Sequence, residues 1–366
     1  MRLLRTWLIP FVVVSCSAGC GGSSGGHAGD DMSVGGGAGS SGSAGNSGSA
    51  GNSGSAGSGG SGGGSAGSGG GSAGSGGGSA GSGGSDGGIA GDTTPTGAPT
   101  WSTQFAAADS SLFTTQDTAA SQITFGLANS SAVDQLAGQL VFPGSTTFGA
   151  NDHAGTDFAT EIDAKATNFQ YGQYRSRVRL AACASTEDVV NGNFTYFNDG
   201  KDHDGDGLID NSEIDIEILC GTPSVLSLTI WSQYTDDNGN FRKWTRAVDL
   251  ETGSYQESTA DNIYDLGPSV SNPDFKYPGF FDPNAFYEMG FEWHSDSIRY
   301  FIVLNNKEIT LWTFTNKALI PQLATQWLFN VWHPATHWFG NGGAANYPAK
   351  DATMQIDWAR YWATTS

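Results

Sequence analysis

From Trp101 onward, apolar and polar residues alternate in short runs that are typical of β-strands. The run "YGQYRSRVRLAAC" (171–183) is the clearest, because Tyr174, Ser176 and Val178 fall on one side of it together with Leu180. The same alternation predicts further strands over residues 192–198, 212–220, 224–234, 286–293, 297–306, 309–315, 326–333 and 353–362.

Gly, Asn, Asp and Pro bound nearly every one of these runs, and no long amphipathic helix interrupts them. Antiparallel sheets with one covered face give this pattern. The prediction for residues 101–366 is therefore one all-β domain, a sandwich of two antiparallel sheets with a sizeable core.

The first hundred residues have a different composition. Residues 1–20 read as a lipoprotein-type signal peptide, in which Arg2 and Arg5 precede an apolar run too short to span a bilayer. Small residues precede Cys16 and Cys20, and Cys16 fits a lipidation site better; the alternative is an ordinary cleaved signal. Residues 21–100 are Gly, Ser and Ala, which predicts a disordered tether. The expected location is the cell surface or the outer membrane, or otherwise the medium.

The net charge limits the classes of binding partner, and the cysteines indicate the compartment. Lys and Arg total 16 against 36 Asp and Glu, a formal charge of −20, which excludes nucleic acid and disfavours sulfated or carboxylated polymers. Cys183 and Cys220 predict a disulfide in an oxidising compartment, with two buried thiols as the alternative. We expect a monomer.

The stretch "DHDGDGLIDNSEIDIE" (202–217) carries two overlapping patterns. Asp202, Asp204, Asp206 and Gly207, with Glu213, match positions 1, 3, 5, 6 and 12 of an EF-hand-type calcium loop. A bidentate calcium ligand cannot also be a free catalytic carboxylate, so the two patterns compete for Glu213.

The second pattern is a strand with a carboxylate face. Glu213, Asp215 and Glu217 recur at period two, with isoleucines between them, so they project to one face while the isoleucines pack behind. Glycosidases use two carboxyl groups that lie a few ångströms apart. Repulsion between like charges at that distance moves the two pKa values apart, so one acid can stay protonated while the other is ionised. The alternative is a solvated acidic sheet face.

The strand "SEIDIE" resembles the active-site strand of the family 16 glycoside hydrolases in its bulge-free form, E-x-D-x-E, as in the lichenases and xyloglucan transglycosylases. Five further stretches resemble family motifs and occur in the family's order. Before "SEIDIE" come "YGQYRSRVRLA" and "NGNFTYF", and after it come "FEWHSDSIRYFIV", "FNVWHPATHWFG" and "QIDWARYW". The resemblance covers roughly residues 160–362. One departure is that Asn211 and Ser212 stand where lichenases usually have Trp-Asp.

This resemblance implies a β-jelly-roll with a concave substrate cleft and a retaining double displacement. Glu213 would be the nucleophile, Asp215 its helper and Glu217 the general acid/base. The chemistry would require no cofactor. An EF-hand also needs its twelfth residue to open a helix, whereas here it opens a strand, so we assign Glu213 to the active site.

Without Glu213, the loop still offers enough oxygens for an open calcium site, and the alternative is a solvated turn. The ligands would be Asp202, Asp204, Asp206 and Asp210, with the Leu208 carbonyl. The family resemblance also implies a second structural calcium through Asp357 in "IDW".

Sugar rings stack on aromatic rings, and polar side chains orient them. The candidate substrate-binding residues are Phe194, Tyr196, Trp231, Asn330, Trp332 and Trp338, with core packing as the alternative for each. His333 and His337 share a loop, but no third metal ligand is apparent in the sequence.

The expected function is endo-acting hydrolysis of a neutral β-glucan. Mixed-linkage β-1,3-1,4-glucan is favoured, followed by β-1,3-glucan and xyloglucan. The alternatives are a transglycosylase and a carbohydrate-binding sandwich without turnover. The intact pair of Glu213 and Glu217 favours an enzyme.

Overall fold

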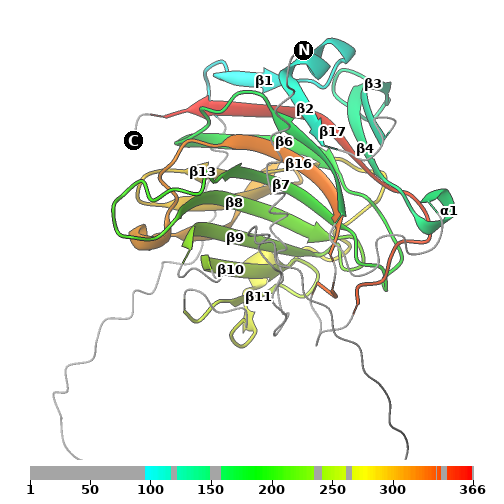
Figure 1. The fold of residues 1–366 in the computed structure, drawn as a ribbon. Coiled ribbons are helices and arrows are strands. Elements are labelled where there is room, and N and C mark those ends of the chain that lie inside the picture. The colour runs from blue at the N-terminus through cyan, green and yellow to red at the C-terminus, as the bar shows by residue number, and fades with distance from the viewer. Residues whose placement is uncertain are drawn as a thin grey trace, which may run out of the picture. The chain divides into compact units, whose positions relative to one another are not determined.

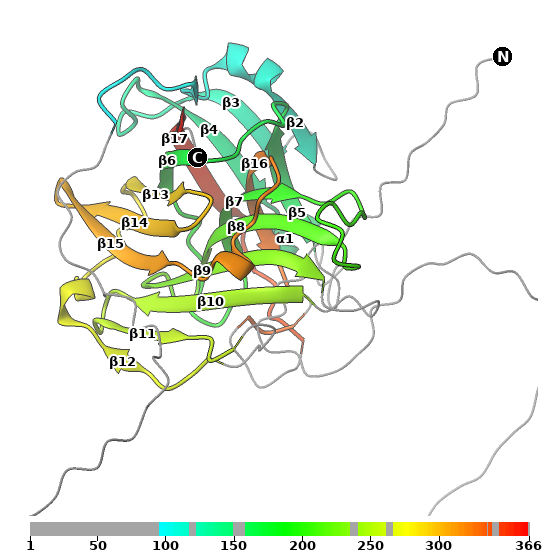
Figure 2. The ribbon, with the colours of Figure 1, turned by 90° about the vertical axis from the view of Figure 1, so that its left-hand side faces the viewer.

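The computed structural model describes residues 95–116, 122–148, 158–234, 241–260, 266–334, 336–338 and 344–364. Within these residues the chain forms two antiparallel β-sheets, shown in two views in Figures 1 and 2. The predicted signal peptide, the lipidation site at Cys16 and residues 21–94 of the predicted tether lie outside the described residues. The end of the predicted tether lies against the domain, because the Thr100 backbone N–H donates to the Tyr361 carbonyl oxygen at 2.8 Å and Trp362 Nε1 donates to the Gly97 carbonyl oxygen at 2.8 Å.

The first sheet has eight strands and contains the last described strand, β17. Its order is β15-β14-β13-β6-β17-β4-β3, and β1 pairs with β17 beside this path. The strands are β15 (Lys307–Phe314), β14 (Ile298–Leu304), β13 (Tyr287–Trp293), β6 (Gly172–Arg179), β17 (Ala352–Ala363), β4 (Leu136–Phe142), β3 (Ile123–Ala128) and β1 (Trp101–Thr103).

The second sheet has nine strands in the order β12-β11-β10-β9-β8-β7-β16-β5-β2. The strands are β12 (Val270–Ser271), β11 (Ser254–Glu257), β10 (Phe241–Asp249), β9 (Val225–Tyr234), β8 (Asp210–Leu219), β7 (Val190–Phe197), β16 (Gln326–His333), β5 (Phe158–Ala164) and β2 (Phe113–Gln116). Figure 1 shows β7 to β10 and β16 side by side, with β8 between β7 and β9.

The strands predicted from the alternation are all present, with ends that differ by a few residues, and the predicted sandwich of two antiparallel sheets is confirmed. The strands that the alternation did not indicate are short or irregular. In β3, for example, Gly126 has a φ of +70° and the pairing with β4 shifts register there. In β10, Arg242, Lys243 and Arg246 place charges on both faces, which hides the period of two.

The core lies between the sheets and explains the alternation. Ile214, Ile216 and Ile218 of β8 are buried in it, so the other face of β8 points away from the core. Tyr174 of β6 stacks on Phe291 of β13 at 4.5 Å between ring centroids. Fully burying a large apolar side chain contributes about 1.5–3 kcal/mol, so the isoleucines fix which face of β8 is turned outward.

Two buried hydrogen bonds tie the sheets together. The Tyr300 hydroxyl donates to the Thr229 carbonyl oxygen at 2.8 Å, and the Asn193 side-chain amide donates to the Ser176 hydroxyl at 2.9 Å. Both bonds connect the strands around β8 to the first sheet. Polar groups buried with their partners satisfied set a single arrangement of the two sheets.

A disulfide joins Cys183, in the segment between β6 and β7, to Cys220, which directly follows β8. The two cysteines are 37 residues apart in sequence and their Cα atoms are 5.4 Å apart. Closing a loop of this size contributes on the order of 3–4 kcal/mol in the chain-entropy model. The disulfide anchors the end of the strand that carries the acids.

The helices in the described part of the chain have six residues or fewer. They are η1 (Ala107–Leu112), α1 (Ser145–Phe148), η3 (Pro273–Phe275) and η4 (Lys317–Leu319). None of them has the length and apolar character needed to cross a membrane.

Candidate active site

The three acids of β8 lie on the face of the nine-stranded sheet that points away from the core, which we call the acid face. Glu213, Asp215 and Glu217 follow each other without a break in register against both neighbouring strands. Their direct neighbours are Tyr196 and Trp231 for Glu213, Phe194 and Thr229 for Asp215, and Gly192 and Ser227 for Glu217. The strand therefore has the bulge-free spacing read from the sequence.

These carboxylates are buried although they lie outside the core. The exposed fraction is 3% for Glu213, 1% for Asp215 and 6% for Glu217. Burying a charged group is costly unless it is hydrogen-bonded or paired, so the state of each acid depends on its contacts.

Trp231 and Asn211 supply hydrogen bonds to this row. Trp231 Nε1 donates to Asp215 Oδ2 at 2.7 Å, and Asn211 Nδ2 donates to Glu213 Oε2 at 3.1 Å. Asn198 Nδ2 in turn donates to Asn211 Oδ1 at 3.1 Å, which fixes the orientation of the amide. Each bond fixes one carboxylate oxygen and orients the carboxylate group.

A β-bulge explains how Asn211 reaches Glu213. Asp210 pairs with Gln233 and Glu213 pairs with Trp231, so β8 spends one more residue than β9 between these pairs. Bulges redirect side chains, and this one lies immediately before the nucleophile candidate. Ser212, the other residue of the bulge, donates its hydroxyl to the Leu323 carbonyl oxygen at 2.9 Å.

A second pair of acids occupies the same face of the sheet. Glu161 and Asp163 of β5 flank Ile162, which is buried in the core, so both acids point to the acid face. Asn330 of β16 lies opposite Glu161, and its Nδ2 donates to Glu161 Oε2 at 3.0 Å. The acid face therefore carries carboxylates from two strands.

Gly192 leaves space for the Asn330 side chain beside Glu217. A Cβ on residue 192 would lie 2.2 Å from Asn330 Oδ1, which is closer than atoms can approach. Gly192 pairs with Asn330 on one side and with Glu217 on the other. Asn330 Oδ1 has no hydrogen-bond partner among the described residues, which leaves an acceptor next to the acids.

Burial raises the pKa values of Glu213 and Asp215. It raises the pKa of Glu213 to about 8, with a further contribution from the charges of Glu217 and Glu161, while the Asn211 hydrogen bond and Lys243 oppose the rise. Burial and the charges of Glu213 and Glu217 raise the pKa of Asp215 well above its ordinary value, against the Trp231 hydrogen bond and Lys243. The set can hold a proton at neutral pH, as a general acid must.

Burial, with the neighbouring Asp163, also raises the pKa of Glu161 to about 8, and the hydrogen bond from Asn330 opposes this rise. Because Glu161 acts on Glu213 as well, protons on the acid face belong to the coupled set of carboxylates rather than to single residues.

The predicted aromatic residues divide into two groups. Phe194 and Tyr196 are half-buried and lie next to Asp215 and Glu213, so part of each ring is open to a ligand. Trp332 and Trp338 pack edge to face at 5.1 Å between ring centroids and are buried with Val190. The prediction that these two tryptophans offer stacking surfaces is wrong for this structure, because neighbouring side chains cover their rings.

Trp231 is also buried, and its contacts are with protein groups. The Lys243 Nζ atom lies 4.7 Å from the centroid of its ring, and its N–H is used by Asp215. We therefore assign Trp231 to support of the acids rather than to stacking on sugar. His333 and His337 do not come together either, because His333 packs between Phe142 and Tyr347 whereas His337 pairs with Asp188.

The aspartate-rich loop brings together part of the predicted calcium ligands. Carboxylate oxygens of Asp202, Asp204 and Asp210 lie within 4.8 Å of one another, the one such group of metal-type ligands among the described residues. Asp206 departs from the prediction, because it is not in this group. Its carboxylate instead accepts from Gln233 Nε2 at 2.7 Å and from the Leu208 backbone N–H at 2.9 Å. Glu213 lies on the acid face, bonded by Asn211, and is not part of this group.

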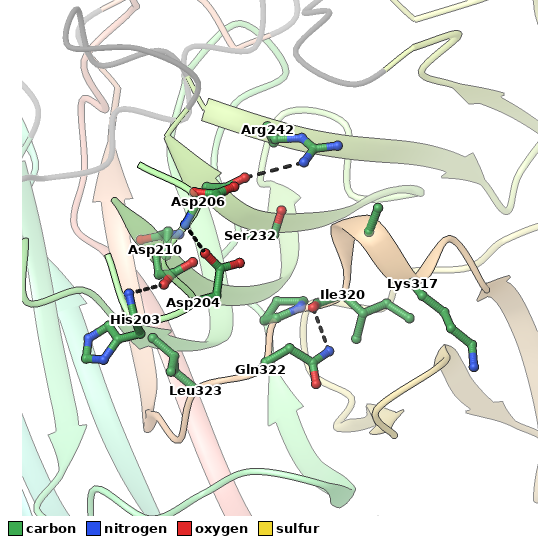
Figure 3. Close-up of a pocket in the computed structure, with 14 residues that line it drawn as sticks. His203, Asp204, Asp206, Asp210, Ser232, Arg242, Lys317, Ile320, Gln322 and Leu323 are labelled. Carbon is green, nitrogen blue, oxygen red and sulfur yellow. Dashed lines mark hydrogen bonds between the residues drawn. The ribbon is translucent and has the colours of Figure 1, made fainter. Parts of the chain in front are cut away.

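A pocket of about 480 Å³ lies beside this loop (Figure 3). Asp204, Asp206 and Asp210 line it on the loop side, while Lys317, Ile320 and Gln322 line it on the other. Asn211 also lines the pocket, so the loop, the pocket and the support of Glu213 are contiguous.

Asp357 does not fit a second calcium site. Both of its carboxylate oxygens accept from the Val133 backbone N–H at 3.0 Å, and Oδ2 forms an ion pair with Arg177 Nη1. Arg177 also donates to the Ser131 carbonyl oxygen at 3.3 Å. The guanidinium thus occupies the position of a cation between a carboxylate and a carbonyl, which corrects the expectation carried over from the family.

Sequence reasoning missed several residues that the structure places around the acids. Glu161 and Asp163 had a readable signal, the period-two run "TEIDA". Asn211 had none, because its direction depends on the bulge. Lys243 had none either, because strand β10 carries charges on both faces.

No protein-family model matches the chain, and no curated protein matches it. Among solved structures, the chain is similar to a β-glucanase of Bacillus licheniformis, with 17% identity over 74% of this chain and 100% of that chain, at a TM-score of 0.45. A Crh5 transglycosylase bound to NAG is 16% identical over 72% of this chain and 84% of its own, at a TM-score of 0.43. A non-specific endo-β-1,3(4)-glucanase from family GH16 is 13% identical over 76% of this chain and 99% of its own, at 0.44.

The raised pKa of Glu213 predicts a pH-dependent gain in stability for Glu213→Gln. With a folded pKa of about 8 against 4.5 unfolded, the folded state keeps a proton that the unfolded chain releases, so stability falls as pH rises through this range. Glu213→Gln cannot ionise. We expect it to exceed the parent by about 1–3 kcal/mol at pH 8 and to match it near pH 4, by denaturant unfolding.

The exposed Asp134→Asn variant is the matched control, for which we expect no such trend. A stability difference between parent and Glu213→Gln that stays constant from pH 4 to pH 8 would contradict the raised pKa.

The Arg177–Asp357 pair predicts a second stability effect. Arg177→Ala leaves Asp357, which is 2% exposed, without its cation, and we expect a loss of about 2–4 kcal/mol. The test uses an Asp204→Ala background, which disables the aspartate-rich loop. In this background calcium should raise the melting temperature of the Arg177→Ala variant and leave the melting temperature of the protein that retains Arg177 unchanged. A fall in the melting temperature of Arg177 protein with chelator in this background would instead indicate a calcium at Asp357.

Proposed function

We propose that this protein is an endo-acting glycoside hydrolase that cleaves internal bonds of a neutral β-glucan with retention of configuration. The observation that carries the proposal is the uninterrupted row of Glu213, Asp215 and Glu217 on one face of β8. Burial and mutual charge let this row hold both a protonated and an ionised carboxyl.

In the proposed first step, a Glu213 oxygen attacks the anomeric carbon while the bond from that carbon to the leaving oxygen breaks. Glu217 gives its proton to the leaving oxygen, and a covalent glycosyl-Glu213 ester results. In the second step Glu217 takes a proton from water, whose oxygen attacks the anomeric carbon and releases Glu213. Asp215, bonded by Trp231, supports the pair by taking part in the shared protonation.

The composition of the acid face supports a neutral substrate. Glu161 and Asp163 add two carboxyl groups to those of β8, and the ionised members of this coupled set would repel anionic sugars. The half-buried rings of Phe194 and Tyr196 suit the apolar face of a sugar. Asn330 Oδ1 is buried, so we assign Asn330 to the support of the acids through its bond to Glu161. Mixed-linkage β-1,3-1,4-glucan is the favoured polymer, with β-1,3-glucan and xyloglucan next.

Two alternatives remain as outcomes of the test. A transglycosylase would pass the glycosyl unit from Glu213 to a sugar hydroxyl in place of water. A binding module would hold the glucan and release nothing. We further propose that the chain is exported and anchored through lipid on Cys16, as the signal sequence suggests.

We expect the mature protein to release reducing ends from mixed-linkage β-glucan, and Glu213→Gln to lose more than about 1000-fold in kcat/KM. Glu217→Gln should lose as much on the polymer but far less on an aryl glycoside, because a good leaving group needs no proton. Asp134→Asn is the control and should keep full activity.

The outcomes separate the hypotheses. Products longer than the substrate, formed when oligosaccharide acceptors are added, would favour the transglycosylase. Glucan binding without turnover by the parent would favour the binding module. Full activity in Glu213→Gln would exclude Glu213 as the nucleophile and favour its alternative assignment as a ligand of the calcium loop.

We also propose that the aspartate-rich loop binds one calcium ion through Asp202, Asp204 and Asp210. Their clustered carboxylate oxygens support this, as does the positive φ of Gly205 and Gly207, which allows the loop its tight turns. Bound calcium would hold the loop at the start of β8 and so steady the bulge before Glu213.

Titration calorimetry with calcium should therefore give heat for the parent and none for Asp204→Ala. Asp206→Asn should keep binding, because Asp206 lies outside the cluster and bonds Gln233. Heat that persists in Asp204→Ala would place calcium elsewhere in the protein, and absence of heat in the parent would leave the loop as a plain turn.

A further inference from the structure

Lys243 is a buried lysine next to the acid row. It lies on β10, and the register between β9 and β10 shifts between Arg242 and Lys243, which sets Lys243 opposite Trp231. Trp231 lies opposite Glu213 in turn, so Lys243, Trp231 and Glu213 form one row across three strands. Only 4% of Lys243 is exposed, whereas an ordinary surface lysine extends into water.

Two hydrogen-bonding contacts confirm that this row shares the acid face. The hydroxyls of Thr229 and Thr245, the next cross-strand pair, lie 3.1 Å apart, and Thr229 is opposite Asp215. Trp231 Nε1 reaches Asp215 Oδ2 at 2.7 Å. Lys243 is therefore turned to the same side as the carboxylates.

The contact between Lys243 and Trp231 has a consequence for Asp215. The ammonium lies 4.7 Å from the centroid of the indole ring, within cation–π range. It lies over the face of the ring whose N–H donates to Asp215, so it limits the orientations of the Trp231 ring and of the Asp215 carboxylate. A cation over the ring also draws electron density from it and makes the N–H a stronger donor.

The surroundings of Glu213 show why a cation matters there. The titratable groups that face it are Asp215 and Glu217 on its own strand, Glu161 on β5, Tyr196 on β7 and Lys243 on β10. The charges of Glu217 and Glu161 oppose ionisation of Glu213, while that of Lys243 favours it. Attack on a sugar requires Glu213 to be ionised.

We propose that Lys243 is a positioning residue for the acid row: its charge favours ionised Glu213, and its contact with Trp231 fixes the orientation of Asp215. This inference deepens the proposed glycosidase function and rests on it. Lys243 itself does not touch the reacting atoms in this assignment. The structural alternative is a lysine that only fills space beside Trp231.

The test compares Lys243→Met, which keeps the length of the side chain and removes its charge, with Lys243→Arg, which keeps the charge. The first readout is the titration of the Glu213 carboxyl by carbon NMR on the mature protein labelled at glutamate, with the signal assigned by its absence in Glu213→Gln. This readout needs no turnover.

We expect Lys243→Met to move the Glu213 titration to higher pH by about one unit, and Lys243→Arg to leave it close to the parent. The acid limb of the profile of kcat/KM against pH should move to higher pH by the same amount. At a given pH on that limb kcat/KM then falls about tenfold, while the plateau value changes little. A space-filling role alone would not move the titration, and an unchanged titration in folded Lys243→Met overturns the inference.

If Lys243→Met does not fold, Lys243→Gln replaces it and carries the same expectation. Trp231→Phe keeps a ring under the ammonium and removes the N–H that holds Asp215, so it should lower kcat. A parent that cleaves no glycan while its Glu213 titration still depends on Lys243 would defeat the proposed function and leave the electrostatic coupling established. A parent that cleaves glycan while its Glu213 titration is independent of Lys243 would support the proposed function and overturn the role of Lys243.

Discussion

The structure depends on keeping three carboxylates buried side by side on one strand. Water would stabilise each charge, and the fold removes most of that water from Glu213, Asp215 and Glu217. What replaces it is a small set of fixed donors and one cation, from Asn211, Trp231 and Lys243. This substitution of oriented groups for solvent is the usual basis of an acid–base site, and it is costly for stability.

The rest of the sandwich can be understood as the support for that row. The isoleucines of β8 fix which face is turned outward, and the hydrogen bonds from Tyr300 and Asn193 fix the two sheets against each other. Gly192 makes room where any side chain would displace Asn330 from its place beside Glu217. Two register shifts, one in β8 and one between β9 and β10, direct Asn211 and Lys243 toward the acids.

The sequence allowed the regular parts to be predicted and not the irregular ones. Strands with strict alternation were read correctly, because burying one face leaves a period of two in the residues. The acid row followed from the same period. Asn211 and Lys243 could not be found, because a bulge changes the face of a residue without changing its identity. Trp332 and Trp338 were misread as open rings, because composition does not show that the two rings pack on each other.

Asp357 shows a related limit. A family pattern carried an aspartate to a calcium site, whereas the neighbouring Arg177 supplies the positive charge from within the chain. The carboxylate is the same residue type in both arrangements, so only the position of its partner across the sheet distinguishes them.

The disulfide between Cys183 and Cys220 adds an order of events to this architecture. It is attached directly after the last residue of β8, next to the Glu217 end of the acid row. Such a bond forms where oxidants are available and not in a reducing cytosol. A chain whose two thiols are still reduced lacks this brace, and the Glu217 end of the acid row becomes fully anchored only once they are oxidised. The anchoring of the acid row therefore depends on the redox conditions around the chain.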